Sequence, residues 1–140
     1  MPANKTVIHE KSGNVLKGMT ADFLPKRALF HLSVRGMHGE EMKKIFIDDL
    51  KAVFFVKDFS GDKDYKEAKG PDALPGSGKK IRVVFKDGET ISGYTHVFNM
   101  DQPGFFLIPL DPKSNNERIF IVFSSLSTLE VDGSPLKLAH

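Results

Sequence analysis

The sequence predicts an all-β protein built from two tandem five-stranded barrels that pack as one body. Three observations lead to this prediction: short runs of alternating apolar and polar residues recur, turn-forming residues separate them, and no long amphipathic helical pattern is present. At 140 residues, about two-thirds of the unfolded chain's surface can be buried. The chain can therefore fold without disulfides, and it contains no cysteine.

The clearest strands belong to the second barrel, which we expect over residues 79–133. An alternating run at 81–85 ends at Asp87-Gly88, which is a strong two-residue hairpin signal. The next strand, 89–98, carries Gly93 in its interior, where a missing side chain marks a bend or a bulge. The chain then turns over residues 99–103.

Three further strands complete the second barrel. Residues 104–110 form the third strand, and Pro109 predicts an edge position or a bulge because it cannot donate to a ladder. Residues 119–123 and 126–131 form the last two. Five strands in about fifty residues is the size of a small barrel.

The first barrel, residues 5–59, repeats the pattern of the second. An alignment of the two copies pairs apolar and turn residues in the same order, as structural duplication would. The identical pairs are Gly13/Gly88, Gly18/Gly93, Thr20/Thr95, Phe23/Phe98, Phe30/Phe105, Leu32/Leu107, Ile45/Ile121 and Leu50/Leu126. Residues 39–44 are interpreted as a loop tip, with a helical turn as the alternative.

Between the copies, residues 60–78 are rich in Gly, Pro, Lys and Asp and predict a linker or an exposed loop. The predicted core is mostly aliphatic and phenylalanine, because the chain has twelve Phe and no Trp. It comprises Phe23, Phe30, Leu32, Ile45, Ile47, Leu50, Val53, Phe98, Phe105, Leu107, Ile121, Phe123, Leu126 and Leu129.

The segments IRVVFKDGETISGYTHVFNMDQPGFFLIPLD and IFIVFSSLSTLEV resemble the two motifs of the Sm-like barrels found in RNA-binding proteins. This resemblance implies two Sm-like barrels. The family's RNA-reading residues are not matched: Asn99 stands for Asp, Gln102-Pro103 for Met-Asn, and Val122-Phe123 for Arg-Gly. An Sm-like RNA-binding protein is therefore the alternative function rather than the favoured one.

The phrases LKAVFFVKDFSGD (50–62) and GFFLIPLDPKSNNERIFIV (104–122) resemble an uncharacterised bacterial domain that occurs alone or attached to signalling modules such as PilZ domains and response regulators. The resemblance implies a non-enzymatic adaptor or sensor module that binds a protein partner or a small ligand. PilZ domains read cyclic di-GMP through an Arg-x-x-x-Arg element, and no two arginines of this chain have that spacing.

Composition and motifs favour a binding role. The net charge of +2 comes from interleaved acidic and basic residues, which is typical of a mixed solvated surface and permits RNA binding without requiring it. No metal-ligand spacing, phosphate loop or nucleophile elbow is found, so we expect no metal, no cofactor and no enzymatic activity. The start of the chain lacks the apolar stretch of a signal peptide, and we expect a cytoplasmic protein without membrane contact.

A polar cluster between two apolar runs is the candidate binding site. Asp111, Lys113, Asn115, Asn116 and Arg118 form a donor-rich set suited to an anion or to a partner's carboxylate. The alternative is that the cluster is only a hairpin, with Arg118 paired to Asp111.

The apolar segment at residues 54–59 has two interpretations that are compatible with each other. Its alternate Phe side chains fill a barrel, or one of its faces lies at an interface between the copies or between chains. The second interpretation includes a homo-oligomer joined through exposed strand edges.

Overall fold

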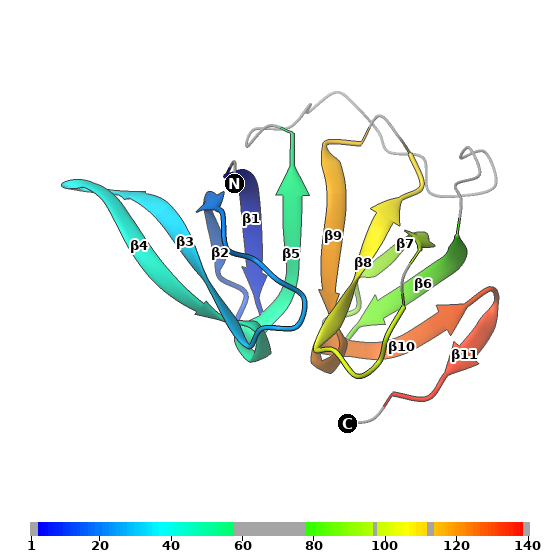
Figure 1. Ribbon diagram of the computed structural model, residues 1–140. Helices are drawn as coiled ribbons and strands as arrows, with labels where there is room; N and C mark the ends of the chain where they lie inside the picture. The colour runs from blue at the N-terminus through cyan, green and yellow to red at the C-terminus, as the bar shows by residue number, and fades with distance from the viewer. Residues whose placement is uncertain (1–2, 58–77, 97, 112–113, 139–140) are drawn as a thin grey trace.

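The computed structural model describes residues 3–57, 78–96, 98–111 and 114–138, and these residues form an all-β protein (Figure 1). The all-β prediction is therefore confirmed. Residues 60–77 of the predicted linker, and 58–59 of the first predicted barrel, lie outside the described residues. Neither short helix of the described residues has the length or the apolar character needed to cross a membrane.

Each half of the chain contains a run of five strands with a 3₁₀ turn before the fifth. The first half comprises β1 (Asn4–Glu10), β2 (Val15–Thr20), β3 (Leu29–Gly36), β4 (Gly39–Phe46), η1 (Ile47–Asp49) and β5 (Leu50–Val56). The second half comprises β6 (Lys79–Phe85), β7 (Thr90–Thr95), β8 (Gly104–Pro109), β9 (Asn116–Val122), η2 (Phe123–Ser125), β10 (Leu126–Val131) and β11 (Ser134–Leu136).

The strands form one open antiparallel sheet with the order β11-β10-β6-β7-β8-β9-β5-β1-β2-β3-β4. Within each half the order is the same: fifth, first, second, third, fourth. The two closed barrels that we expected are not confirmed, because β5 of the first half pairs with β9 of the second half and the sheet stays open. These two strands lie side by side in the middle of the molecule (Figure 1).

The halves also share local geometry, as the predicted repeat requires. The Thr20 hydroxyl donates to the His31 carbonyl and the Thr95 hydroxyl donates to the Phe106 carbonyl, each over 2.8 Å. A Cβ on Gly93 would collide with the backbone oxygen of Ile108 on the neighbouring strand. The interior glycine thus marks a close approach of two backbones.

Two hydrophobic clusters lie on opposite faces of β5 and β9. Core one, on the side of the first half, contains Ile8, Phe30, Leu32, Ile45, Ile47, Leu50, Val53, Phe55, Phe120 and Val122. Core two, on the side of the second half, contains Ala52, Ile81, Val83, Phe85, Phe105, Leu107, Ile119, Ile121, Leu126 and Leu129.

Alternate residues of β5 and β9 enter different cores. Phe55 and Phe120 belong to core one, whereas Ala52 and Ile119 belong to core two. A strand buried on both faces reads as a continuous apolar run, which is why these segments do not alternate in sequence. The core of each half is therefore completed by side chains from a strand of the other half. This sharing explains why the sheet is continuous.

The predicted core is close to the observed one. Eleven of the fourteen predicted residues are buried, and Phe23, Phe98 and Phe123 are partly buried and pack against the two clusters. In the described part of the apolar segment at 54–59, Phe55 fills core one of the open sheet instead of a closed barrel, and β5 lies at the interface between the two halves, as the second interpretation expects.

Two local predictions about the first half and β8 were wrong. Residues 39–44 belong to strand β4 instead of a loop tip, because Gly36 and Gly39 close a tight turn and the charged residues that follow pair with β3. Pro109 predicted an edge strand or a bulge, but β8 is an interior strand that pairs with β7 and β9 in an unshifted register. Pro109 is tolerated because its ladder with β9 ends at Leu107.

The hairpin at Asp87-Gly88 is present but has a longer loop than expected. The amide of Phe85 donates to the carbonyl of Glu89, so three residues form the loop, and Gly88 takes a φ of 95°. This geometry is a turn followed by a left-handed residue, which favours glycine. Strand β11, which the sequence did not predict, continues β10 through a turn at Asp132-Gly133.

Candidate functional site

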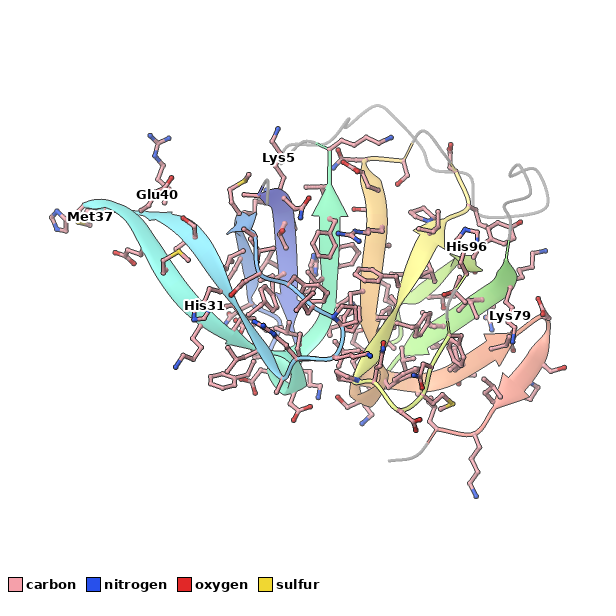
Figure 2. All side chains as sticks on the ribbon, in the orientation of Figure 1. Lys5, His31, Met37, Glu40, Lys79 and His96 are labelled. Atoms are coloured by element: carbon pink, nitrogen blue, oxygen red, sulfur yellow. The ribbon has the colours of Figure 1, made fainter. Side chains whose placement is uncertain are left out.

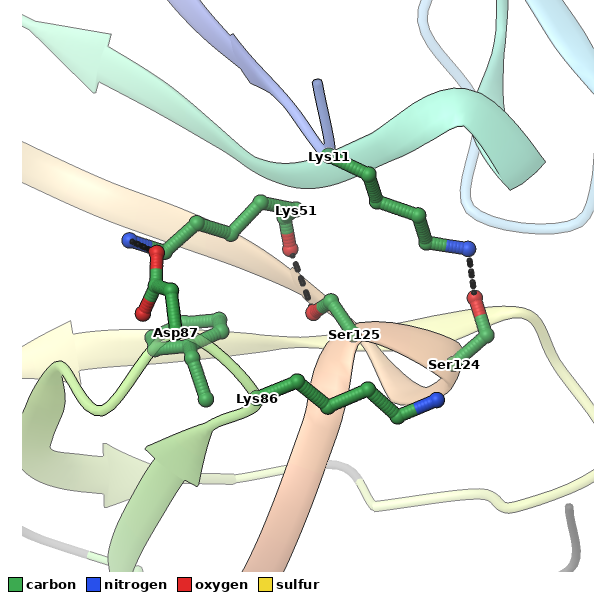
Figure 3. A pocket seen from close by; sticks show the side chains of 7 residues that line it. Lys11, Lys51, Lys86, Asp87, Ser124 and Ser125 are labelled. Atoms are coloured by element: carbon green, nitrogen blue, oxygen red, sulfur yellow. Dashed lines mark hydrogen bonds and ion pairs between the residues drawn. The ribbon is translucent and has the colours of Figure 1, made fainter. Parts of the chain in front are cut away.

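A pocket lies where the turns of the two halves meet, at the ends of β1, β6 and β9. We call it the junction pocket; its volume is about 230 Å³ (Figure 3). Its lining residues come from both halves of the chain and are Lys11, Lys51, Phe85, Lys86, Asp87, Ser124 and Ser125.

Lys11 and Lys86 occupy equivalent positions in the two halves. Each follows the first strand of its half in a three-residue hairpin loop that ends in a glycine of positive φ, Gly13 or Gly88. The amide of Lys86 donates to the carbonyl of Ser125, as the amide of Lys11 does to the η1 turn, each over 2.9 Å. The repeat thus brings two lysines to one pocket.

The side chain of Lys11 connects the two halves. Its Nζ donates to the carbonyl of Asp48 in η1 and to the hydroxyl of Ser124 in η2, each over 2.6 Å. Beside it, the buried Ser125 hydroxyl lies 2.6 Å from the Val122 carbonyl and 2.9 Å from the Lys51 carbonyl. These bonds fix the position of the two serines relative to the first half.

The third lysine of the pocket is neutralised. The Nζ of Lys51 lies 2.7 Å from a carboxylate oxygen of Asp87, also bonds Glu89, and sits 4.7 Å from the centre of the Phe85 ring. Burial alone would lower the pKa of Lys51, but hydrogen bonds to the two carboxylates outweigh it and raise the pKa. The hydrogen bond from Lys51 in turn holds the pKa of Asp87 below its ordinary value.

His9 lies on the same side of the junction. Its ring centre is 4.7 Å from that of Phe54. Burial, followed by the charge of Lys51, lowers the pKa of His9. This shift favours the neutral form of His9.

The uncompensated charge of the pocket is positive. Among the described residues, neither Lys11 nor Lys86 pairs with a carboxylate, whereas Asp87 is held by Lys51. Two ammonium groups and the Ser124 hydroxyl therefore face one hollow. Such a set can donate several hydrogen bonds to an anion.

The polar cluster predicted from the sequence lies at the opposite end of β9: Asp111 and Asn115 precede the strand, whereas Asn116 and Arg118 belong to its first residues. The amide of Ser114 donates to the Asp111 carbonyl over 3.0 Å, and the amide of Asn116 donates to the Ser114 hydroxyl over 3.1 Å. The Asn115 carbonyl accepts from the amide of Lys57 over 2.8 Å. These contacts use backbone groups and the Ser114 hydroxyl, and they give residues 111 and 114–116 local structural roles. The predicted site residue Lys113 lies outside the described residues.

Arg118 is engaged by the aromatic residues of core one. Its guanidinium lies 4.5 Å from the Phe55 ring centre and 4.6 Å from that of Phe106. The group thus covers the core at the start of β9, which is a structural use of its charge and its planar shape. The structure brings Asp111, Asn115 and Asn116 near one another and directs Arg118 onto the rings.

Sequence analysis missed the junction pocket. The signal was nevertheless present, because the alignment that pairs Gly13 with Gly88 also pairs Lys11 with Lys86. What could not be foreseen is that the β5–β9 pairing would bring Lys11 to Ser124, which is 113 residues away in the chain. Within the described ranges, no group of three or more His, Asp or Glu residues could hold a metal ion.

Comparison with known proteins places the chain in a family. Searches of the curated proteins and of the solved structures found no significant match. A protein-family model matches residues 2–133, which is nearly the whole chain. The chain therefore belongs to DUF6982, a family of unknown function.

Proposed function

We propose that the protein is a non-enzymatic sensor or adaptor module that binds a small anionic ligand in the junction pocket. The observation that carries this proposal is the pair of equivalent lysines, Lys11 and Lys86, which share a hollow of about 230 Å³ without carboxylate partners among the described residues. The ligand class is a compact phosphate or carboxylate compound, because ammonium and hydroxyl groups bond the oxygens of either.

A binding role suits this pocket better than acid–base chemistry. The pKa of Asp87 is lowered by its hydrogen bond from Lys51, so this carboxylate is a weak base. The Ser125 hydroxyl is buried and lies within hydrogen-bond distance of two backbone carbonyls. The remaining polar groups, Lys11, Lys86 and Ser124, are suited to holding a ligand.

The location of the pocket suits a sensor. Lys11 belongs to the first half and Lys86 to the second, so a ligand held by both stabilises their arrangement relative to each other. The place of the module in bacterial signalling, in the company of PilZ or response-regulator domains, rests on the sequence resemblance alone. A protein partner would then distinguish the ligand-bound module from the ligand-free one.

RNA binding by an Sm-like fold remains the second candidate, and two residues argue against it. At the positions where the Sm-like motif carries Arg-Gly, this chain has Val122 and Phe123. Val122 is 1% exposed in core one, and Phe123 packs against core two. Neither side chain has a group that could bond a base edge.

Isothermal titration calorimetry tests the proposal with two probes, pyrophosphate for the phosphate class and citrate for the carboxylate class. We expect at least one probe to bind the wild-type chain. Lys11→Gln and Lys86→Gln should each weaken its binding about tenfold or more, because a hydrogen bond to a charged group contributes roughly 1.5–3 kcal/mol. Lys79→Gln is the matched control, since this exposed lysine begins β6 whereas the pocket lies at the end of that strand.

Two results would overturn the proposal. In the first, neither probe binds, or both lysine variants bind as the wild type does. In the second, a short single-stranded RNA binds tightly at physiological salt, with an affinity that falls steeply as salt is added. That result would establish the RNA-binding alternative instead.

A further inference from the structure

The two edges of the sheet are unlike each other. At one edge, within the part of the chain that the structure describes, β4 pairs only with β3, and its side chains are exposed except for Ile45. Figure 2 shows Met37 and Glu40 at the far end of this hairpin, which projects away from the other strands. At the other edge the short strand β11 covers β10. The open edge of β4 carries backbone donors and acceptors that another strand could pair with.

The pairing of β9 with β5 inside the molecule indicates which kind of strand could pair with the open edge of β4. In the repeat, β4 corresponds to β9: Lys43 lies opposite Leu32 in β3 as Ile119 lies opposite Leu107 in β8. β9 pairs with β5, the fifth strand of the other half. β4 is thus a fourth strand that lacks the fifth-strand neighbour its counterpart has.

A fifth strand of the kind that β4 lacks as a neighbour lies near the other edge of the sheet. β10 is the fifth strand of the second half, and Glu130 lies opposite Arg82 in β6 as Phe54 lies opposite Val7 in β1. On the corresponding side, β5 pairs with β9, whereas among the described strands β10 pairs only with β11. The outer side of β10 is therefore the counterpart of the side of β5 that joins the halves.

We propose that β4 of one copy pairs with the outer side of β10 of a second copy, in the register of the β5–β9 junction, once β11 has moved away. In that register Phe54 lies opposite Ile119, so Glu130 of one copy would lie opposite Lys43 of the other. Opposite charges directly across an antiparallel pair are favourable. β10, Leu126–Val131, has no basic residue, so this contact places no like charge opposite Lys43.

β11 is suited to the role of a removable cover. It has three residues, all exposed, and three paired positions on β10. Asp132-Gly133 forms a two-residue turn with both φ angles positive, so Pro135 falls at a position whose nitrogen points away from β10. The outer side of β11 therefore lacks a donor at Pro135, which disfavours the addition of another strand while β11 is in place.

Sedimentation velocity on full-length variants tests the proposal. Leu136→Asp should release β11, since this residue pairs opposite Leu129, and should make self-association at least tenfold stronger than in the wild type. Val131→Cys with Ser134→Cys should do the reverse when oxidised. The two positions face each other, the chain has no other cysteine, and paired strand residues have the spacing of a disulfide. Reduction should then restore the wild-type behaviour.

A charge exchange in the Leu136→Asp background tests the register. Lys43→Glu and Glu130→Lys should each suppress self-association, because each places like charges across the contact. A mixture of these two variants should associate, since every contact between unlike copies again pairs opposite charges. Circular dichroism checks that each variant is folded.

Four outcomes would overturn the proposal. The Leu136→Asp variant could remain monomeric at all concentrations, the oxidised double-cysteine variant could associate as the wild type does, or the mixture of charge variants could behave as its separate components. Since the contact joins two different edges, the assemblies should not stop at a symmetric dimer. A strictly dimeric product would likewise contradict it.

Discussion

Phe120 should stabilise the first half of the molecule although it belongs to a strand of the second half. Its side chain is 0% exposed in core one, with ring centres 5.0 Å from Phe23 and 5.2 Å from Phe106. Phe120→Ala should lower the free energy of unfolding by about 3–5 kcal/mol, the usual cost of removing a buried phenyl ring. In a chain of this size, that loss lowers the melting temperature by roughly 10–20 °C.

The assay is urea unfolding followed by circular dichroism, together with amide hydrogen exchange resolved by segment. Phe46→Ala is the control: the same atoms are removed from a residue that is 47% exposed, and the loss should stay below about 1 kcal/mol. In Phe120→Ala, protection should fall in β1 and β3 as well as in β9, because these strands share core one. If β1 and β3 kept wild-type protection while only the second half lost it, the shared core would be refuted.

Three further predictions concern single residues. Gly93→Ala should destabilise the protein by about 1–3 kcal/mol in urea unfolding, because the added Cβ would collide with the backbone of β8. The control variant Thr90→Ala, in the same strand, should change stability by less than about 0.5 kcal/mol. The pKa of Asp87 is lowered in the folded protein by its hydrogen bond from Lys51. The ion pair therefore stabilises the fold at pH values above the ordinary carboxyl pKa, and this stabilisation is lost as the pH falls through the folded-state pKa. Lys51→Met should return the pKa of Asp87, measured by NMR titration, towards its ordinary value. Arg118→Ala should lower the melting temperature by a few degrees through the loss of two ring contacts worth about 0.5–1 kcal/mol each, and an unchanged melting temperature would contradict the structural role of this residue.

Much of the fold could be predicted from the sequence because strand periodicity and turn chemistry are local. Alternation identified which of Ile81 and Arg82 faces the core, and the glycines of the hairpin loops identified where the chain reverses. Which strands pair across the halves is not local information. The continuous apolar runs of β5 and β9 indicate strands that are buried on both faces, but the same runs would also fit a strand inside a single barrel.

The parts that were missed have specific physical causes. β4 is an edge strand exposed on both faces, with charged residues at 40, 41, 43 and 44, so its residues lack the alternation of a half-buried strand. β11 has only three residues, and Pro135 masks its strand character. The junction pocket depends on long-range pairing, whereas the cluster from Asp111 to Arg118 was visible because its residues are neighbours in sequence.

We propose that a ligand binds at the junction pocket and not at the polar cluster near the start of β9. The two candidate sites lie at opposite ends of β9, so amide chemical shifts can tell them apart. On titration of the ¹⁵N-labelled chain with the bound probe, pyrophosphate or citrate, the largest shifts should fall on Lys11, Lys86 and Ser124. Shifts confined to Asn115 and Asn116, or spread evenly over exposed lysines, would contradict the account.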